Sequence, residues 1–192
     1  MSGLETNHSQ ISDTLILQLL QADGNQERGF RLLMEIYQER LYWVVRRLVF
    51  DHDDANDVVQ NCLIKVYRSI HTFEGKSQLY TWLYRIATNE AITFLNRERR
   101  RMATSIDDAS NQVAGRLQAD AFFDGNEAQA KLFRAMDTLP GKQKLVFNLR
   151  YFEEMSYEDM SEVLGTSVGA LKASFHHAVK KIENHIRGSE PA

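Results

Sequence analysis

The sequence lacks the features of several protein classes. It has a single cysteine, Cys62, among 192 residues, which excludes an internal disulfide framework and any zinc site built on several cysteines. Only two prolines, Pro140 and Pro191, interrupt it, so long helices are easily accommodated. No stretch approaches the ~18 consecutive apolar residues of a membrane span, and no basic start precedes an apolar run at the N-terminus. We therefore expect a folded cytoplasmic protein without membrane insertion.

Strand signals are also missing, because no segment joins strict alternation with β-branched residues and hairpin turns. Apolar residues recur instead at three- and four-residue spacing, which is typical of amphipathic helices. This spacing predicts helices over residues 30–50, 54–70 and 79–100, and further helices from 127, after Pro140, over 157–164 and over 168–186. The sequence therefore predicts an all-α protein.

Polar residues, proline and glycine mark the expected helix ends. Asp53 or Asp54 is available as the N-cap of the second helix, and Ser156 caps the short helix that follows it. Pro140 suits the first turn of the next helix. Gly165 can adopt the left-handed conformation that ends a helix, and it leads into the last helix. A short helix, a glycine turn and a longer helix together predict a helix-turn-helix.

The net charge of −3 is unevenly distributed along the chain. Residues 27–101 carry a net +3 and residues 128–192 carry +1, whereas residues 102–127 carry −4 and show little apolar periodicity. Such a composition is typical of a linker between two domains. We expect an N-terminal extension (1–26), a first domain (27–101), a flexible acidic linker (102–127) and a second domain (128–187).

Basic residues are the candidates for nucleic-acid contact. Four arginines, Arg97, Arg99, Arg100 and Arg101, close the first domain. They either favour the negative end of the helix dipole and solvate a surface, or form a phosphate-binding cluster. In the last helix, the face opposite the apolar stripe carries small, basic and hydrogen-bonding side chains, which suit base edges and phosphates. A helix-turn-helix shape also occurs as a plain helical hairpin, so these patterns alone leave DNA binding open.

Three segments carry a resemblance to a known family. They are DDANDVVQNCLIKVYRSI (53–70), LYTWLYRIATNEAITFLNRERRR (79–101) and SYEDMSEVLGTSVGALKASFHHAVKKI (156–182). The first two resemble region 2 of the sigma-70 family, and the third is similar to the promoter −35 reading region of its extracytoplasmic-function (ECF) group. The resemblance implies an RNA polymerase sigma factor, a subunit without catalysis of its own that binds core polymerase and directs it to promoters.

The resemblance also implies a polymerase-binding surface on the helix over 54–70, which in this family docks on the clamp coiled coil of the large polymerase subunit. The matching positions are Asp57, Gln60, Asn61, Ile64 and Arg68. Ile64 is an apolar residue within a polar stripe, as in a partner hot spot, although single exposed apolar residues are also common without any function. Asn61 departs from the family, which usually has glutamate there, and so removes one carboxylate from this surface.

For promoter DNA, the resemblance implies two reading surfaces. At the −10 element a base is flipped from the non-template strand close to Asn89, and the phosphate-binding residues are Lys76, Arg85, Arg97, Arg99, Arg100 and Arg101. At the −35 element the last helix contributes Lys172, Ala173, Ser174, His176, His177 and Lys180. Many family members carry arginine at the positions occupied here by Ser174, His177 and Val179. Since a largely neutral histidine cannot grip guanine with two donors, we expect weaker guanine readout.

Two rival functions remain open on the sequence. A free-standing DNA-binding regulator would use the same helix-turn-helix and bind duplex DNA tightly without polymerase. A helical interaction module with no nucleic-acid role would not explain the basic residues of the last helix. No close carboxylate pair or nucleophile with a paired base stands out, so an enzyme is not expected. A metal or cofactor is not expected either. His176 and His177 are neighbours in a helix, so their side chains point apart. The resemblance leaves room for an anti-sigma factor as a partner.

Overall fold

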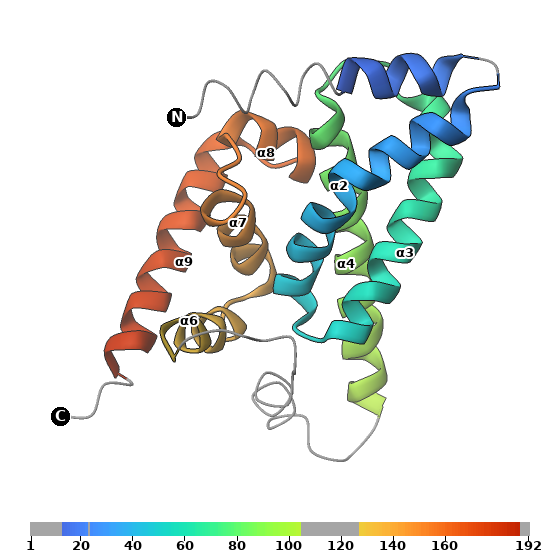
Figure 1. Cartoon of the computed structure of the whole chain (residues 1–192). Coiled ribbons are helices and arrows are strands. Elements are labelled where there is room, and N and C mark those ends of the chain that lie inside the picture. Colours follow the sequence, from blue (N-terminus) through green and yellow to red (C-terminus); the bar gives the residue numbers. More distant parts are fainter. Residues whose placement is uncertain (1–12, 23, 105–126, 189–192) are drawn as a thin grey trace.

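The computed structural model describes residues 13–22, 24–104 and 127–188, and within them the chain forms helices and no strand. The all-α prediction is therefore confirmed. Most of the predicted acidic linker, residues 105–126, and the first part of the predicted N-terminal extension, residues 1–12, lie outside the described residues. The helices form two units, one before and one after this gap, which pack side by side (Figure 1).

The first unit is a bundle of α2 (Gln26–Val49), α3 (His52–Ser69) and α4 (Leu79–Thr104), with the short 3-10 helix η1 (Ile70–Thr72) after α3. The three long helices pack against one another. The predicted N-cap of α3 was wrong, because Asp51 takes that position: its backbone is extended and its side chain accepts the Asp54 N–H at 3.0 Å. Asp53 and Asp54 lie in the first helical turn, where the helix dipole favours acidic side chains.

The second unit contains α6 (Glu127–Asp137), α7 (Gly141–Tyr151), α8 (Tyr157–Leu164) and α9 (Val168–Gly188). Ser156 caps α8 as predicted, since its hydroxyl accepts the Asp159 N–H at 3.0 Å. Gly165 ends α8 with φ +60°, in the left-handed region that only glycine adopts without strain. Pro140 was predicted in the first turn of α7 but occupies the N-cap position instead. Helices α8 and α9 thus form the expected helix-turn-helix.

A further helix over residues 13–21 was not predicted. It packs on the start of α2, where Ile16 is fully buried in the core and the Tyr37 hydroxyl donates to Asp13 Oδ1 at 2.5 Å. Gly29 permits this close approach, because a Cβ there would lie 2.9 Å from both the backbone N and the Cγ of Leu20. The sequence signal is weak, since the helix is short and its apolar periodicity covers only about two turns.

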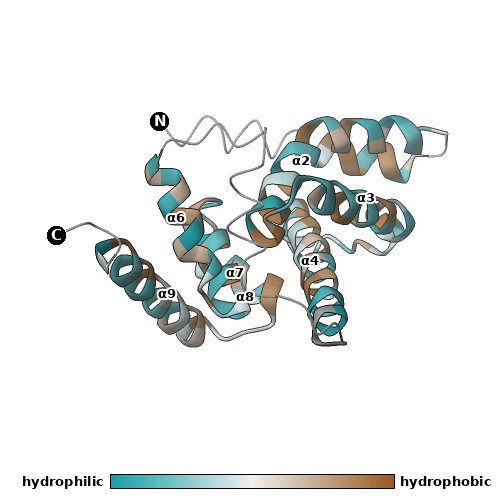
Figure 2. Ribbon diagram, turned by 90° about the horizontal axis from the view of Figure 1, so that it is seen from below, coloured by the Kyte–Doolittle hydropathy of each residue, from teal (hydrophilic) through white to brown (hydrophobic). Residues whose placement is uncertain are grey.

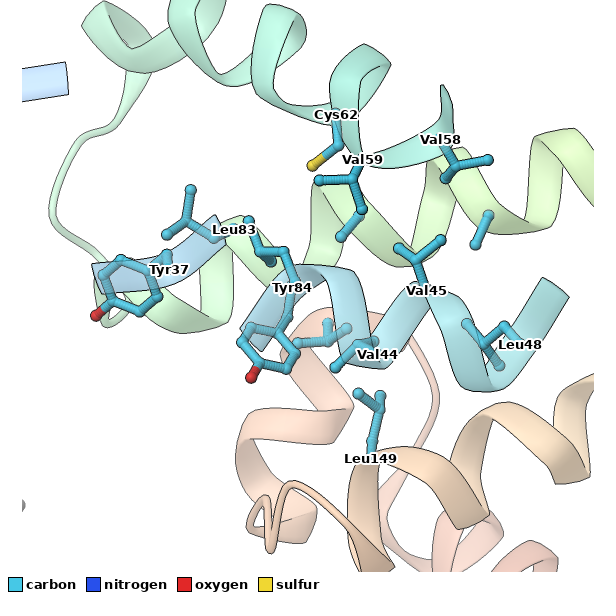
Figure 3. Close-up of a cluster of buried hydrophobic side chains, with 14 of the residues drawn as sticks. Tyr37, Val44, Val45, Leu48, Val58, Val59, Cys62, Leu83, Tyr84 and Leu149 are labelled. Carbon is cyan, nitrogen blue, oxygen red and sulfur yellow. The ribbon is translucent and has the colours of Figure 1, made fainter. Parts of the chain in front are cut away.

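The two units share one hydrophobic core, which the sequence does not predict. Helix α7 packs on α2, and α8 packs on α4. Leu149 of α7 is fully buried, and it points toward Val44 of α2 (Figure 3). Met155, Met160 and other apolar residues of the second unit belong to the same buried cluster as the core of the first unit. The two helical units predicted from the sequence are both present, and they also pack directly on each other.

Polar contacts fix the alignment of this shared interface. Asn148 is completely buried on α7, and its side-chain amide donates to the Val44 carbonyl of α2 at 2.8 Å. Glu153, just after α7, accepts from Arg47 of α2 at 2.7 Å and from the Tyr84 hydroxyl of α4 at 2.6 Å. Because buried polar groups are costly without partners, these bonds favour one relative position of the units over neighbouring ones.

We expect Leu149→Ala to destabilise the first unit as well as the second. Removing a fully buried leucine costs about 2–5 kcal/mol in the free energy of unfolding. The two tryptophans, Trp43 and Trp82, both belong to the first unit. Urea unfolding followed by tryptophan fluorescence therefore reports whether a change in α7 is felt across the interface.

The matched control is Ile92→Ala, because Ile92 is 39% exposed on α4 and its loss costs little. The shared core predicts a lower urea midpoint for Leu149→Ala and an almost unchanged midpoint for the control. An unchanged tryptophan-detected transition in Leu149→Ala would contradict the shared core.

Candidate nucleic-acid interface

Helix α9 presents its predicted polar face to solvent. Leu171, Ala178 and Ile182 are buried against the second unit, as the apolar stripe predicts. The Phe175 ring stacks on Phe147 of α7, with ring centroids 5.9 Å apart, and so fixes the rotation of α9 about its axis. The exposed candidates are Lys172, Ala173, His176, His177 and Lys180. Ser174 is the exception, because it is only partly exposed on the inner side of the helix.

An aromatic side chain that sequence reasoning missed supports Lys172. The ring of Tyr157, at the start of α8, has the Lys172 ammonium 5.6 Å from its centroid and the Arg150 guanidinium at 5.1 Å. Arg150 also donates to the backbone carbonyl of Met155 at 2.9 Å. Cation–π contacts of this kind hold two positive charges at the entrance to the helix-turn-helix. Nothing in the spacing of these three residues along the chain indicates that they meet.

Helix α4 and the loop before it carry a second basic surface. Arg85 and Asn89 are exposed one helical turn apart. Lys76 in the preceding loop is exposed and forms an ion pair with Glu74. The four arginines near the end of α4 are all exposed, but Glu98 lies within 2.8 Å of Arg101 and 3.9 Å of Arg97. The positive charge of the arginine cluster is thus partly offset by one carboxylate. Such exposed ion pairs contribute little to stability.

Helix α3 lies at the edge of the molecule opposite α9, with α2, α4, α7 and α8 between them (Figures 1 and 2). Its inner face buries Val59, Cys62 and Val66. Its outer candidates are all exposed: Asp57, Gln60, Asn61, Ile64 and Arg68. Ile64, at 44% exposure, is one of the few large apolar residues on the described surface. Burial raises the pKa of the Cys62 thiol to about 12, so this cysteine stays protonated and unreactive.

A groove beside this α3 surface was not predicted. It has a volume of about 480 Å³ and lies between α2 and α3. His52 forms part of its wall, with the Tyr42 hydroxyl 2.8 Å from Nδ1 and the Asn56 amide 3.0 Å from Nε2. The other lining residues are Met34, Glu35, Gln38, Glu39, Trp43 and Val59. These residues come from two antiparallel helices. Residue spacing within a single helix therefore does not reveal the groove.

A metal site and a membrane-spanning helix have little support in the part of the chain that the structure describes. Across residues 13–22, 24–104 and 127–188, three or more histidine, cysteine, aspartate or glutamate side chains do not gather as they would around a metal ion. In the same residues, none of the helices combines the length and the apolar character that crossing a membrane requires.

Comparison with known proteins identifies both helical units. The family model for sigma-70 region 2 matches residues 33–101, and the model for sigma-70 region 4 matches residues 129–182. The ECF RNA polymerase sigma-E factor of Haemophilus influenzae is 34% identical over 186 residues, covering 93% of this chain and 97% of that protein. The protein of the same name from Escherichia coli K12 is 31% identical and covers 93% of this chain and 96% of its own.

Two solved structures share the fold. One is the sigma factor RpoE in complex with the anti-sigma factor NepR from Bartonella quintana, with a TM-score of 0.68 and 22% identity, covering 85% of this chain and 99% of that one. The other is CnrH in complex with the cytosolic domain of CnrY, with a TM-score of 0.68 and 20% identity. It covers 93% of this chain and 99% of that one. The helical units and their order thus define a sigma-70 family protein. Within that family, this chain belongs to the ECF group.

Proposed function

We propose that this protein is a promoter-specificity subunit that binds core RNA polymerase through α3 and reads promoter DNA with α4 and α9. The observation that carries the proposal is the pairing, in one chain, of a region 2 bundle with a helix-turn-helix whose recognition face is exposed. A sigma factor acts by binding and contributes no catalytic step. It works where polymerase and promoters are, in the bacterial cytoplasm.

The polymerase contact is assigned to the outer face of α3. Asp57, Gln60 and Asn61 supply polar groups around the exposed side chain of Ile64, and Arg68 extends the surface one turn further. An apolar anchor within a polar rim is the usual composition of an interaction hot spot. The partner is the clamp coiled coil of the large polymerase subunit. Asn61 contributes hydrogen bonds but no charge to this contact.

The −10 contact is assigned to α4 and the preceding loop. Asn89 would bond the edge of the flipped base, while Arg85 and Lys76 hold the backbone on either side of it. The basic residues Arg97, Arg99, Arg100 and Arg101 extend this positive strip along the helix. Because flipping a base costs a few kcal/mol, the strand is read only when polymerase has separated the duplex.

The −35 contact is assigned to the exposed face of α9. Lys172, supported by Tyr157, and the adjacent His176 and His177 reach base edges, and Lys180 reaches a phosphate. Ala173 is small enough to accept a thymine methyl group. Ser174 lies toward the inner side, so its contribution is smaller than the sequence pattern suggests.

An anti-sigma protein is a further partner of this proposal, since both solved relatives described above were determined with a bound partner and one of these is named an anti-sigma factor.

Run-off transcription with core polymerase tests the function directly. We expect promoter-dependent transcripts only when this protein is added, and none with the double variant Asp57→Ala, Ile64→Asp. Both side chains are exposed, so the variant keeps its helical content by circular dichroism while losing the polymerase contact. The matched control, Leu15→Asp with Glu27→Ala, also changes two exposed positions and should transcribe normally.

The same assay separates the rival function. A free-standing regulator would bind promoter duplex without polymerase at about 10⁻⁸ M or better and would give no transcripts with core polymerase. Full transcription by the Asp57→Ala, Ile64→Asp variant would show that α3 is not the polymerase contact.

We expect His177→Arg to tighten holoenzyme binding to promoter fragments. The added charge faces the groove, and each new phosphate contact steepens the salt dependence by about one unit. If the arginine meets guanine instead, the base preference at one −35 position should shift, because arginine donates two hydrogen bonds to guanine. The measurement is holoenzyme affinity across a salt series, with each −35 base varied in turn. Unchanged affinity and preference in both His177→Arg and His177→Ala would show that position 177 does not face DNA.

A further inference from the structure

Two adjacent histidines occupy the proposed −35 reading face. His176 and His177 are both exposed on α9, which lies at the outer edge of the second unit (Figure 1). Their ring centroids are 6.0 Å apart, with an interplanar angle of 61°. Successive residues of a helix are turned by about 100°, so the two rings lie on either side of a line through Ala173 and Lys180. Both rings therefore face a duplex that lies against the exposed side of α9.

The charged groups beside the two rings on α9 are all positive. The side chains within one turn of a histidine are Lys172, Lys180 and Lys181. Residues 165–182 contain no aspartate or glutamate, and the next carboxylate along α9, Glu183, lies about two turns from His176. The helix itself therefore offers no negative charge next to either imidazole.

Helices α6, α7 and α8 pack against the buried side of α9, away from the histidines. The acidic side chains of these three helices are Glu127, Asp137, Glu158, Asp159 and Glu162. Tyr157 of α8 and Arg150 of α7 face α9 at Lys172, one turn from His176. Within the described residues, neither histidine ring forms an ion pair or a hydrogen bond. Both rings thus keep their nitrogen atoms available for DNA.

Duplex DNA supplies the missing negative charge. Its phosphates favour the positively charged form of a nearby imidazole, and histidine ordinarily changes charge between about pH 5 and 8. Binding to DNA should therefore take up protons, so affinity increases as the pH falls, by up to about tenfold per pH unit for each proton. Because two charged rings 6.0 Å apart repel each other, the pair takes up one proton more readily than two.

A proton on the ring also changes which bases it can bond. A neutral imidazole has one donor and one acceptor, whereas the imidazolium has two donors and no acceptor. In the major groove, guanine presents two acceptors, N7 and O6, and cytosine presents its N4 amino donor. The neutral ring can therefore bond to either base. The charged ring can bond to guanine but has no acceptor for the amino group of cytosine.

We propose that His176 and His177 make −35 recognition depend on protons. As the pH falls, the holoenzyme binds promoters more tightly and discriminates more strongly in favour of guanine over cytosine at a base that faces these rings. This inference rests on the proposed function and adds a regulating ion and a preferred class of −35 element to it. At higher pH the neutral rings tolerate a wider set of elements.

Glutamine is a suitable replacement for the neutral ring, because it has donors and an acceptor and carries no charge at any pH. The test variant is His176→Gln with His177→Gln. The matched control is His185→Gln, which changes a partly exposed histidine in the last turn of α9. The probe is a duplex promoter fragment that the holoenzyme transcribes in the run-off assay, with each −35 base exchanged between guanine and cytosine in turn.

Holoenzyme affinity is measured between about pH 6 and pH 8 at constant ionic strength. Over this range the wild type and His185→Gln should gain about three- to thirtyfold more affinity than the double variant. Calorimetry in buffers of different ionisation enthalpy should show about one proton fewer taken up by the double variant. At one −35 position the preference for guanine over cytosine should increase about three- to tenfold at the lower pH, and only when the histidines are present.

Two results would overturn the proposal. One is a pH dependence of affinity that the double variant retains in full, because polymerase groups common to all variants would then account for it. The other is a preference for guanine that does not change with pH in the wild type. A holoenzyme that transcribes from no fragment would refute the proposed function instead. Calorimetry of the free protein with duplex DNA at low salt would then still measure whether the two histidines take up a proton.

Discussion

The contact between Glu153 and two helices of the first unit is the interaction on which the arrangement of the molecule depends. The carboxylate lies in the segment between α7 and α8 and bonds to Arg47 and Tyr84, which are 106 and 69 residues away in sequence. Apolar packing around Leu149 also joins the two units, but such packing is not directional. The polar bonds therefore determine which of several packed arrangements is favoured.

This arrangement divides the surface of the protein by role. The second unit covers parts of α2 and α4, while α3 and the recognition face of α9 remain exposed at opposite edges (Figure 2). The proposed contacts with polymerase and with DNA thus lie apart from the interface that holds the units together.

Much of the fold could be predicted from the sequence, because the signals are local. The helices follow apolar periodicity, and Ser156 and Gly165 mark a helix start and a helix end by their own backbone chemistry. The same periodicity placed Ile64 outside and Cys62 inside on α3. Local reasoning failed at Asp51, where three acidic residues compete for one cap. Ser174, which the family resemblance placed among the DNA-contacting residues, is only partly exposed.

The features of the candidate site that could not be predicted depend on contacts between separate elements. Tyr157 meets Lys172 across a turn, the groove beside His52 needs two helices, and the Glu153 contacts need three segments. No periodicity within one element encodes such meetings, so only the folded chain reveals them.

The shared core of the two units is tested most directly by small-angle X-ray scattering of the free protein. A compact chain of this length has a radius of gyration of about 16 Å, and the account predicts a value close to that. The scattering profile should be that of a single body. In Glu153→Gln the distribution of distances within the molecule should broaden. A profile of two separated bodies in the wild type, with a clearly larger radius, would contradict the account.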